Sequence, residues 1–162
     1  MAKQLPIEIF MPPNMLKAKV GGSIAGLDSS MIKRAEAAME EMKTEFVNWL
    51  GNDVDKLIEA RDRFAALCDA ETRAELFRAG HDLKGGAQTY EFPLIARMAS
   101  SLCKLIDGLE NADAIPLAMI DAHVDAIRVL YRDKIKDAQN RMAIMLSEEL
   151  ESRVTETLEK AR

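Results

Sequence analysis

The sequence has few of the residues that build β-sheets and tight turns. Of its 162 residues, 5% are aromatic, 8 are glycine and 5 are proline. An all-β fold needs many turns and many aromatic or β-branched strand residues, so this composition argues against one. The chain also lacks an apolar run of about 18 residues, the length that a membrane-crossing helix requires.

Positive charge is not in excess either. The 22 basic residues are outnumbered by 27 acidic ones, which gives a net charge of -5. We therefore expect neither nucleic acid nor a membrane surface as a partner. Residues 1–10 lack the basic and then apolar pattern of a secretory signal, and the two cysteines, Cys68 and Cys103, are expected to stay reduced. These features predict a cytoplasmic protein.

Helix-forming residues dominate what is present. Alanine, leucine, methionine, glutamate and lysine are abundant, and 48% of the residues are hydrophobic. We predict an all-α fold, an antiparallel four-helix bundle with an N-terminal arm or extra helix and a C-terminal helical extension. Prolines and glycines mark residues 1–27 as an extended arm. The bundle is expected over residues 28–137 and the extension over residues 138–162.

Apolar residues that recur at spacings of three and four predict the individual helices. They cover residues 28–50, 53–67, 70–90, 93 to about 108–111, 116–131 and 134–160. Gly51 and Asn52 are predicted to stop or kink the first helix, whereas Pro93 suits the first turn of a helix and Pro116 opens the next one. Trp49 is expected to anchor the first helix, and the methionines are expected to fill the core. The buried stripe predicted for the last helix comprises Met142, Met145 or Leu146, Leu150, Val154 and Leu158.

Residues 78–90 break a rule inside a strong helical pattern. A glycine in a helix interior costs about 1 kcal/mol against alanine, so Gly85 and Gly86 together cost about 2 kcal/mol. At about 100° per residue, Lys84 and Gly85 lie within about 60° of His81, and Gln88 lies on the same side two turns further on. Because the apolar stripe of this helix points elsewhere, His81 is expected to face solvent.

An exposed histidine beside a lysine and a glycine suits phosphoryl transfer. A neutral imidazole is a competent nucleophile near pH 7, a lysine supplies positive charge for an anion on the ring, and a glycine leaves room for another protein. Positioning and charge neutralisation are what phosphoryl transfer mainly requires. The alternative at this point is a surface histidine without a function, followed by two glycines that mark a helix end.

Two segments carry a resemblance to a known family. The run His81-Asp82-Leu83-Lys84-Gly85-Gly86-Ala87 resembles the His-x-x-Lys-Gly motif of histidine-containing phosphotransfer (HPt) domains. About twenty residues later, Leu102-Cys103-Lys104-Leu105-Ile106-Asp107 is similar to the Leu-Cys-x-x-Leu-Glu segment on the next helix of that family. The resemblance is strongest over residues 71–110 and extends, in helix order, over about 30–135.

The resemblance implies a phosphoryl carrier in a multistep two-component relay, without autokinase or ATPase activity. His81 would accept the phosphoryl group on Nε2, Lys84 would stabilise that group, and Gly85 would give a receiver domain room to dock. Gln88 could hydrogen-bond near the imidazole. These four residues form the predicted catalytic set.

Response-regulator receiver domains are the partners that the resemblance implies, with a hybrid histidine kinase as a further candidate. Phe77, four residues before His81 on the same face, and Arg78 are expected to contact them. No cofactor or metal is expected in this chain, because Mg²⁺ would belong to the receiver domain. The sequence leaves open the direction of phosphoryl flow and the choice between monomer and homodimer.

One residue departs from the family pattern. Many members have a glycine ten residues after the histidine, where the helix ends, and this chain has Glu91. A residue with a Cβ must then make the turn into Pro93. This departure affects the expected shape of the loop and the edge of the partner-binding surface more than it affects the expected role of His81.

Two other functions remain open. His81-Asp82-Leu83-Lys84 also resembles the phosphorylated-histidine box of sensor histidine kinases, but that box continues into a proline where this chain has Gly85-Gly86. A dimeric histidine phosphotransferase with the helical hairpin of those kinases and no ATP site is one alternative, with residues 138–162 as a dimer contact. A non-catalytic adaptor bundle is the other.

The second histidine and the cysteine of the fourth helix are given structural interpretations. His123 shares the fifth predicted helix with Ile120 and Ile127, and we interpret it as a boundary histidine and not as a second phosphorylation site. Cys103 lies beside the apolar stripe of its helix, where a free cysteine behaves as a small hydrophobic residue.

Overall fold

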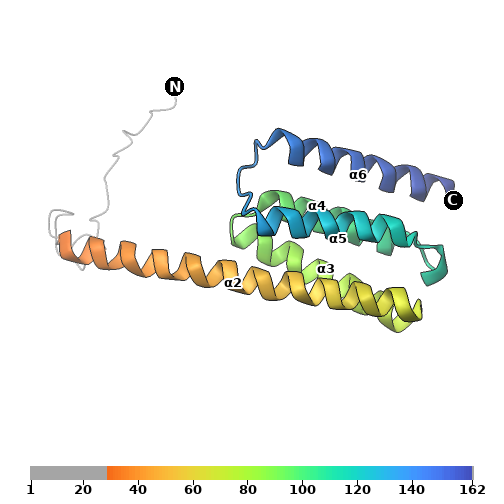
Figure 1. The fold of residues 1–162 in the computed structure, drawn as a ribbon, viewed down its shortest axis with the longest axis horizontal. Helices are drawn as coiled ribbons and strands as arrows, with labels where there is room; N and C mark the ends of the chain where they lie inside the picture. The colour runs from red at the N-terminus through yellow and green to blue at the C-terminus, as the bar shows by residue number, and fades with distance from the viewer. Residues whose placement is uncertain (1–28, 162) are drawn as a thin grey trace, which may run out of the picture. The chain divides into compact units, whose positions relative to one another are not determined.

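The computed structural model describes residues 29–161, and these are helical apart from short connections (Figure 1). The elements are α2 (Ser29–Leu67), α3 (Ala70–Thr89), α4 (Pro93–Asp107), the short 3-10 helix η2 (Ala112–Ala114), α5 (Leu117–Arg132) and α6 (Arg141–Lys160). No strand occurs within these residues, which confirms the predicted all-α class. The predicted arm, residues 1–27, lies outside the described residues.

The chain divides by its internal contacts into two units, residues 1–39 and residues 40–162. The described part of the first unit is the beginning of α2. The second unit holds the rest of α2 and all of α3 to α6, and the hydrophobic core lies within it. The division into residues 1–27, 28–137 and 138–162 stays a prediction.

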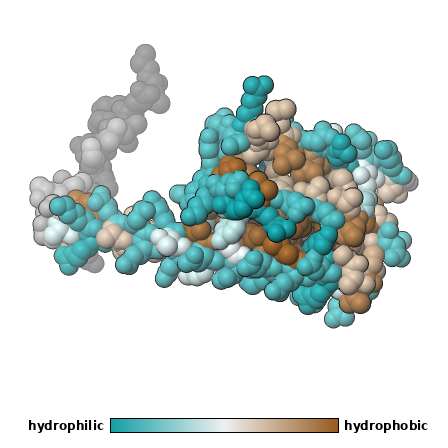
Figure 2. Space-filling model, viewed as in Figure 1, coloured by the Kyte–Doolittle hydropathy of each residue, from teal (hydrophilic) through white to brown (hydrophobic). Residues whose placement is uncertain are grey.

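Helix α4 is the centre of the bundle. It packs against α3, α5 and α6, and α5 also packs against α6. Figure 1 shows these four helices side by side, and the short connections between them make successive helices antiparallel. Because it has neighbours on most sides, α4 buries ten of its fifteen residues. On the face drawn in Figure 2, apolar residues show between the helices of this unit and hydrophilic residues cover much of the outside.

Helix α2 runs without interruption through Gly51 and Asn52, so the helix break predicted there is wrong. Gly51 is buried, and a Cβ at this position would collide with the Tyr131 hydroxyl of α5. That hydroxyl donates to the backbone carbonyl of Val47, at 3.4 Å. The glycine therefore allows two helices to approach closely, a role that its local sequence does not reveal.

Surface positions hold most of the methionines of the described helices and also Trp49. Of the seven methionines in the described helices, Met98 is buried and five are exposed, namely Met31, Met39, Met42, Met142 and Met145. The prediction that methionines fill the core is therefore wrong for these five. Trp49 is 47% exposed, although its ring contacts the rings of Phe46 and Tyr90. Helical spacing in the sequence identified an apolar face on α2 and on α6, but it could not show whether another helix covers that face.

Helix α6 packs on α4 and α5 through a stripe that differs from the predicted one in the first half of the helix. Its buried residues are Ala143, Ser147, Leu150 and Val154, so the prediction was correct for the last two. The predicted Met142, Met145 and Leu146 are exposed instead. The small side chains at 143 and 147 let the helix approach its neighbours, and the Ser147 hydroxyl is satisfied by donating to the Ala143 carbonyl at 2.8 Å.

Candidate functional site

Helix α3 begins at a complete N-terminal cap. The Asp69 carboxylate accepts from the Thr72 backbone N–H at 2.8 Å, and the Thr72 hydroxyl accepts from the Asp69 N–H at 3.2 Å. This capping box satisfies two backbone donors that the first turn leaves free. The bond from Thr72 also holds the pKa of Asp69 below its usual value. The helix then continues to Thr89, as predicted, with His81 near its middle.

His81 lies on the exposed side of α3. The buried residues of this helix are Thr72, Leu76, Gly80, Leu83 and Ala87, which face the rest of the bundle. His81, Lys84, Gly85 and Gln88 are all exposed. The expectation that these four residues share a solvent-facing side is confirmed, and their chemical roles stay predictions.

The same four residues line one surface depression together with α4. This depression has a volume of about 530 Å³ and is completed by Thr89, Pro93, Ala96, Arg97 and Ser100. The start of α4 thus forms the second wall of the His81 surface. Arg97 and Ser100 were not predicted. They lie three residues apart on one side of α4, but only the packing of α4 on α3 shows that this side adjoins His81.

A second depression, of about 410 Å³, adjoins His81 on the side nearer the beginning of α3. Its lining comprises Arg73, Ala74, Phe77, Arg78, His81 and Asp107. The ring of Phe77 stacks beside the imidazole, with centroids 6.2 Å apart and planes inclined by 23°. The structure therefore brings both predicted partner-binding residues, Phe77 and Arg78, to the surface around His81.

The three glycines of α3 have different neighbours. A Cβ on Gly80 would lie 3.2 Å from the Cys103 sulfur, and a Cβ on Gly86 would lie 3.2 Å from both Asp53 and Tyr90. A Cβ on Gly85 would meet nothing within 4 Å. Packing within the molecule thus explains why positions 80 and 86 hold small residues. At Gly85 there is open space beside His81 instead.

Two arginines near the site are held by bonds to other parts of the bundle. The Arg97 guanidinium forms a two-pronged pair with the Glu151 carboxylate of α6, with both N–O distances at 2.7 Å. This pair lowers the pKa of Glu151. Arg73 donates from Nη2 to the carbonyls of Ile106 and Leu109, at 2.7 and 2.9 Å, where α4 ends. Lys84 and Arg78, in contrast, are exposed on α3 itself.

The turn after α3 keeps the geometry that a glycine would give it. Glu91 has a φ of 66°, in the left-handed region that favours glycine. The Phe92 N–H donates to the Ala87 carbonyl at 2.8 Å, the six-to-one bond of a Schellman motif. The departure at position 91 therefore does not change the type of turn. Pro93 then occupies the first turn of α4, as predicted.

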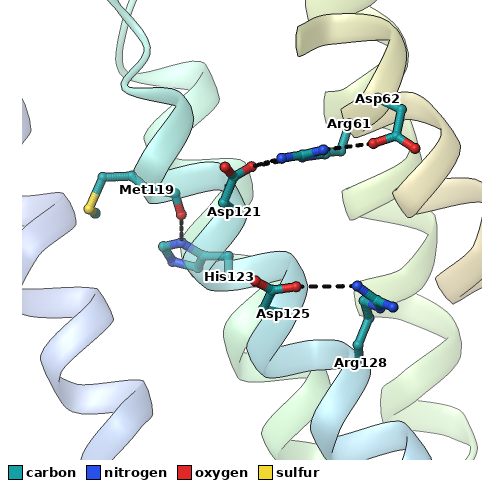
Figure 3. A network of polar contacts seen from close by, with 7 residues as sticks. All are labelled: Arg61, Asp62, Met119, Asp121, His123, Asp125 and Arg128. Carbon is teal, nitrogen blue, oxygen red and sulfur yellow. Dashed lines mark hydrogen bonds and ion pairs between the residues drawn. The ribbon is translucent and has the colours of Figure 1, made fainter.

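His123 belongs to the core and not to its boundary. It is 0% exposed and bonded at both ring nitrogens. Nδ1 lies 2.7 Å from the Met119 carbonyl, the contact drawn in Figure 3, and Nε2 lies 3.0 Å from the Ser101 hydroxyl. Because a carbonyl only accepts, Nδ1 carries the proton and Nε2 accepts from Ser101. Burial lowers the pKa of this imidazole, and a receiver domain cannot reach it.

Neither cysteine takes part in a disulfide. Cys103 is buried beside Gly80, and burial raises the pKa of its thiol to about 11, so the thiol stays protonated near neutral pH. Cys68 donates to the Asp113 carboxylate at 3.4 Å. Among the described residues, no group of three or more histidine, cysteine or acidic side chains is placed to hold a metal ion.

The fold and the site together define a class of protein. An antiparallel helical bundle displays a histidine on a helix face, beside a basic side chain and open space, where another macromolecule can approach it. No helix within the described part of the chain is long and apolar enough to cross a membrane.

The family model named Hpt domain matches residues 41–159, and the chain belongs to this family. It therefore functions in the phosphotransfer of two-component signalling, in which Hpt domains generally interact with receiver domains and histidine kinases. No curated protein and no solved structure matches the chain significantly. The matched range begins within α2 and ends within α6, and it includes all of α3, α4 and α5.

Proposed function

We propose that this protein relays a phosphoryl group between the aspartates of receiver domains through a phosphohistidine at His81. The observation that carries the proposal is the contrast between the two histidines of the sequence. His81 is exposed, whereas His123 is 0% exposed and has both ring nitrogens bonded. A histidine that exchanges a phosphoryl group with another protein must reach the surface of that protein, which only His81 does.

The transfer is a displacement at phosphorus. The neutral imidazole of His81 attacks with Nε2 while the proton stays on Nδ1. The N–P bond forms as the bond between phosphorus and the aspartyl oxygen of the receiver breaks, so the aspartate leaves as a free carboxylate. The reverse displacement then gives the group to an aspartate of a second receiver, and Mg²⁺ belongs to the receiver in both steps.

The neighbours of His81 have supporting roles in this proposal. Lys84 offsets negative charge on the phosphoryl group, and Gln88 hydrogen-bonds near the imidazole from the next turn. Gly85 lets the receiver backbone approach, which agrees with the open space around its Cβ position. Phe77 and Arg78 contact the partner. Two free cysteines fit a cytoplasmic setting for the relay.

The test follows radiolabelled phosphate from a phosphorylated receiver domain, with Mg²⁺, to the purified full chain. We expect an acid-labile, alkali-stable label on the wild type and on His123→Gln, and none on His81→Gln. Lys84→Ala should acquire label about 10-fold more slowly, since it loses one charge that stabilises the transferred group. Adding a second, unphosphorylated receiver should then remove the label from the wild type.

A small phosphodonor makes the test independent of the choice of receiver. Phosphoramidate should label His81 of the wild type without any partner. Label that persists in His81→Gln would overturn the assignment of the acceptor. A wild type that neither phosphoramidate nor any receiver can label would favour the non-catalytic adaptor bundle.

A further inference from the structure

We propose that Phe77 is a positioning residue for phosphoryl transfer, which holds the His81 imidazole in its reactive orientation. This inference rests on the proposed function of His81. It gives Phe77 a role within the free protein, before any partner binds. That role differs from the contact with a partner that the sequence suggested for the same side chain.

The geometry of α3 places Phe77 directly beneath the imidazole. The two residues are four positions apart, so they lie one turn apart on the same face. Side chains of an α-helix lean towards its N-terminus, so the imidazole of His81 leans over the ring of Phe77. The centroid distance of 6.2 Å and the interplanar angle of 23° are those of an offset stack.

The ring of Phe77 is held more firmly in place than the imidazole of His81 that stacks on it. Phe77 is half-buried and packs against the hydrophobic core, whereas His81 is exposed. The backbone carbonyl of Phe77 also lies 3.9 Å from the Cys103 sulfur of α4, a weak thiol hydrogen bond that ties this turn to the centre of the bundle. A side chain anchored in this way can restrict a mobile neighbour.

No other group performs this task within the described residues. His81 forms no hydrogen bond and no ion pair in residues 29–161, so neither ring nitrogen is held by a partner atom. The buried His123 differs in this respect, because its orientation is fixed by bonds to Met119 and Ser101. An exposed imidazole without such bonds samples several rotamers, and only some of them aim a given nitrogen at an incoming phosphorus.

Lys84 completes the arrangement from the other side. It follows His81 by three residues and lines the same depression, and because side chains of an α-helix lean towards its N-terminus, its ammonium can reach the imidazole. The imidazole therefore lies between the ring of Phe77 and the position that the Lys84 ammonium can reach. An imidazole fixed by the ring keeps the phosphoryl group within reach of the ammonium, so the two residues act on the same step.

Labelling by phosphoramidate separates positioning from docking, because this small donor needs no protein surface. We expect Phe77→Leu, tested in the full chain, to be labelled about 3- to 10-fold more slowly than the wild type, since an imidazole without the stack is less often aligned. Phe77→Tyr keeps an aromatic ring and should stay within about 2-fold of the wild-type rate. The matched control is Phe46→Leu, which removes an aromatic stack on Tyr90, away from His81.

An NMR measurement of the His81 side chain provides a readout that does not depend on the chemistry. Its χ1 coupling constants should show one dominant rotamer in the wild type and in Phe77→Tyr, and rotamer averaging in Phe77→Leu. Thermal unfolding confirms that each variant is folded, and Phe77→Met replaces Phe77→Leu if the latter is not.

The outcomes distinguish this proposal from the function on which it rests. If Phe77→Leu is labelled by phosphoramidate at the wild-type rate and the χ1 of its His81 is unchanged, the positioning role is overturned. If, in addition, its transfer from the receiver is slower, Phe77 acts in docking instead. Persistent label in His81→Gln would instead overturn the function. The coupling constants would still report whether Phe77 orients the ring.

Discussion

Gly85 and Gly86 show how two identical neighbouring residues can serve different purposes. Gly86 lies against Asp53 of α2 and the ring of Tyr90, so packing within the fold favours a small residue there. A Cβ on Gly85 would meet nothing within 4 Å. In the free protein this glycine therefore lowers helix stability without any gain in packing. The benefit is expected when a partner docks beside His81.

Substitution of Gly85 should therefore separate stability from function. We expect Gly85→Ala to raise the free energy of unfolding by about 1 kcal/mol, because alanine has the higher helix propensity and no neighbour obstructs it. Gly85→Leu should instead slow transfer from a receiver at least about 10-fold by blocking its approach. Urea unfolding measures the first effect, and the labelling assay measures the second.

The adjacent glycine is the control for this prediction. Gly86→Ala places a Cβ 3.2 Å from Asp53 and Tyr90, so it should gain less stability than Gly85→Ala or lose some. Equal stabilisation by both alanine variants, or normal transfer by Gly85→Leu, would contradict our account of Gly85.

At the scale of elements, the ends of α3 decide how the site is presented. A capping box at Asp69 and Thr72 starts the helix, and a left-handed residue at Glu91 ends it. The Schellman bond from Phe92 turns the chain into α4, whose first two turns form the second wall of the His81 depression. The unusual residue at position 91 thus lies at a turn that the site depends on.

Replacing Glu91 by glycine should stabilise the protein. A left-handed conformation costs a residue with a Cβ about 1–2 kcal/mol, whereas glycine loses about 0.5–1 kcal/mol more backbone entropy on folding. We expect Glu91→Gly to raise the free energy of unfolding by about 0.5–1 kcal/mol, as measured by urea unfolding. Glu91→Ala keeps the Cβ and should change little. A loss of stability in Glu91→Gly would show that the Glu91 side chain itself supports the turn.

At the scale of the whole molecule, one buried and two partly buried polar contacts link the helices of the bundle. His123 of α5 bonds to Ser101 of α4, and the Arg97–Glu151 pair joins α4 to α6. On the other side of α5, Asp121 accepts from Arg61 of α2 at 2.7 Å (Figure 3). These bonds satisfy polar groups between packed helices and favour one arrangement of the bundle.

The burial of His123 predicts how stability depends on pH. Its pKa in the folded protein is below the usual value of 6.5, because burial disfavours the charged form. As the pH falls through 6.5, the unfolded chain binds a proton at His123 that the folded protein does not. The free energy of unfolding should therefore decrease from pH 7.5 to pH 5, and less so in His123→Gln.

Urea unfolding of both proteins at several pH values measures this difference. The carboxylates of Asp69, Asp133 and Glu151 also titrate in the fold, but their pKa values are lowered, so their stabilising effect is lost only at more acidic pH. The prediction would be contradicted if the free energy of unfolding changed with pH equally in the wild type and in His123→Gln above pH 5.

Local signals in the sequence were sufficient for α3, α4 and α5 and for one face of the site. Prolines 93 and 116, the apolar spacing of α3 to α5, and the angular positions of His81, Lys84, Gly85 and Gln88 all gave correct predictions. Such features depend on residues three or four positions apart, because backbone hydrogen bonds and helix phase are set within one or two turns.

Tertiary packing decided the features that involve residues distant in sequence. Gly51 could not be recognised as a packing position without Tyr131, nor His123 as a core residue without Ser101. The exposed face of α6 and the approach of Arg97 to the His81 depression depend on how the helices dock against one another. The sequence by itself therefore determined α3, α4 and α5 and the solvent-facing side of His81. The packing determined what surrounds His81, because helix phase is a local property and contact between helices is not.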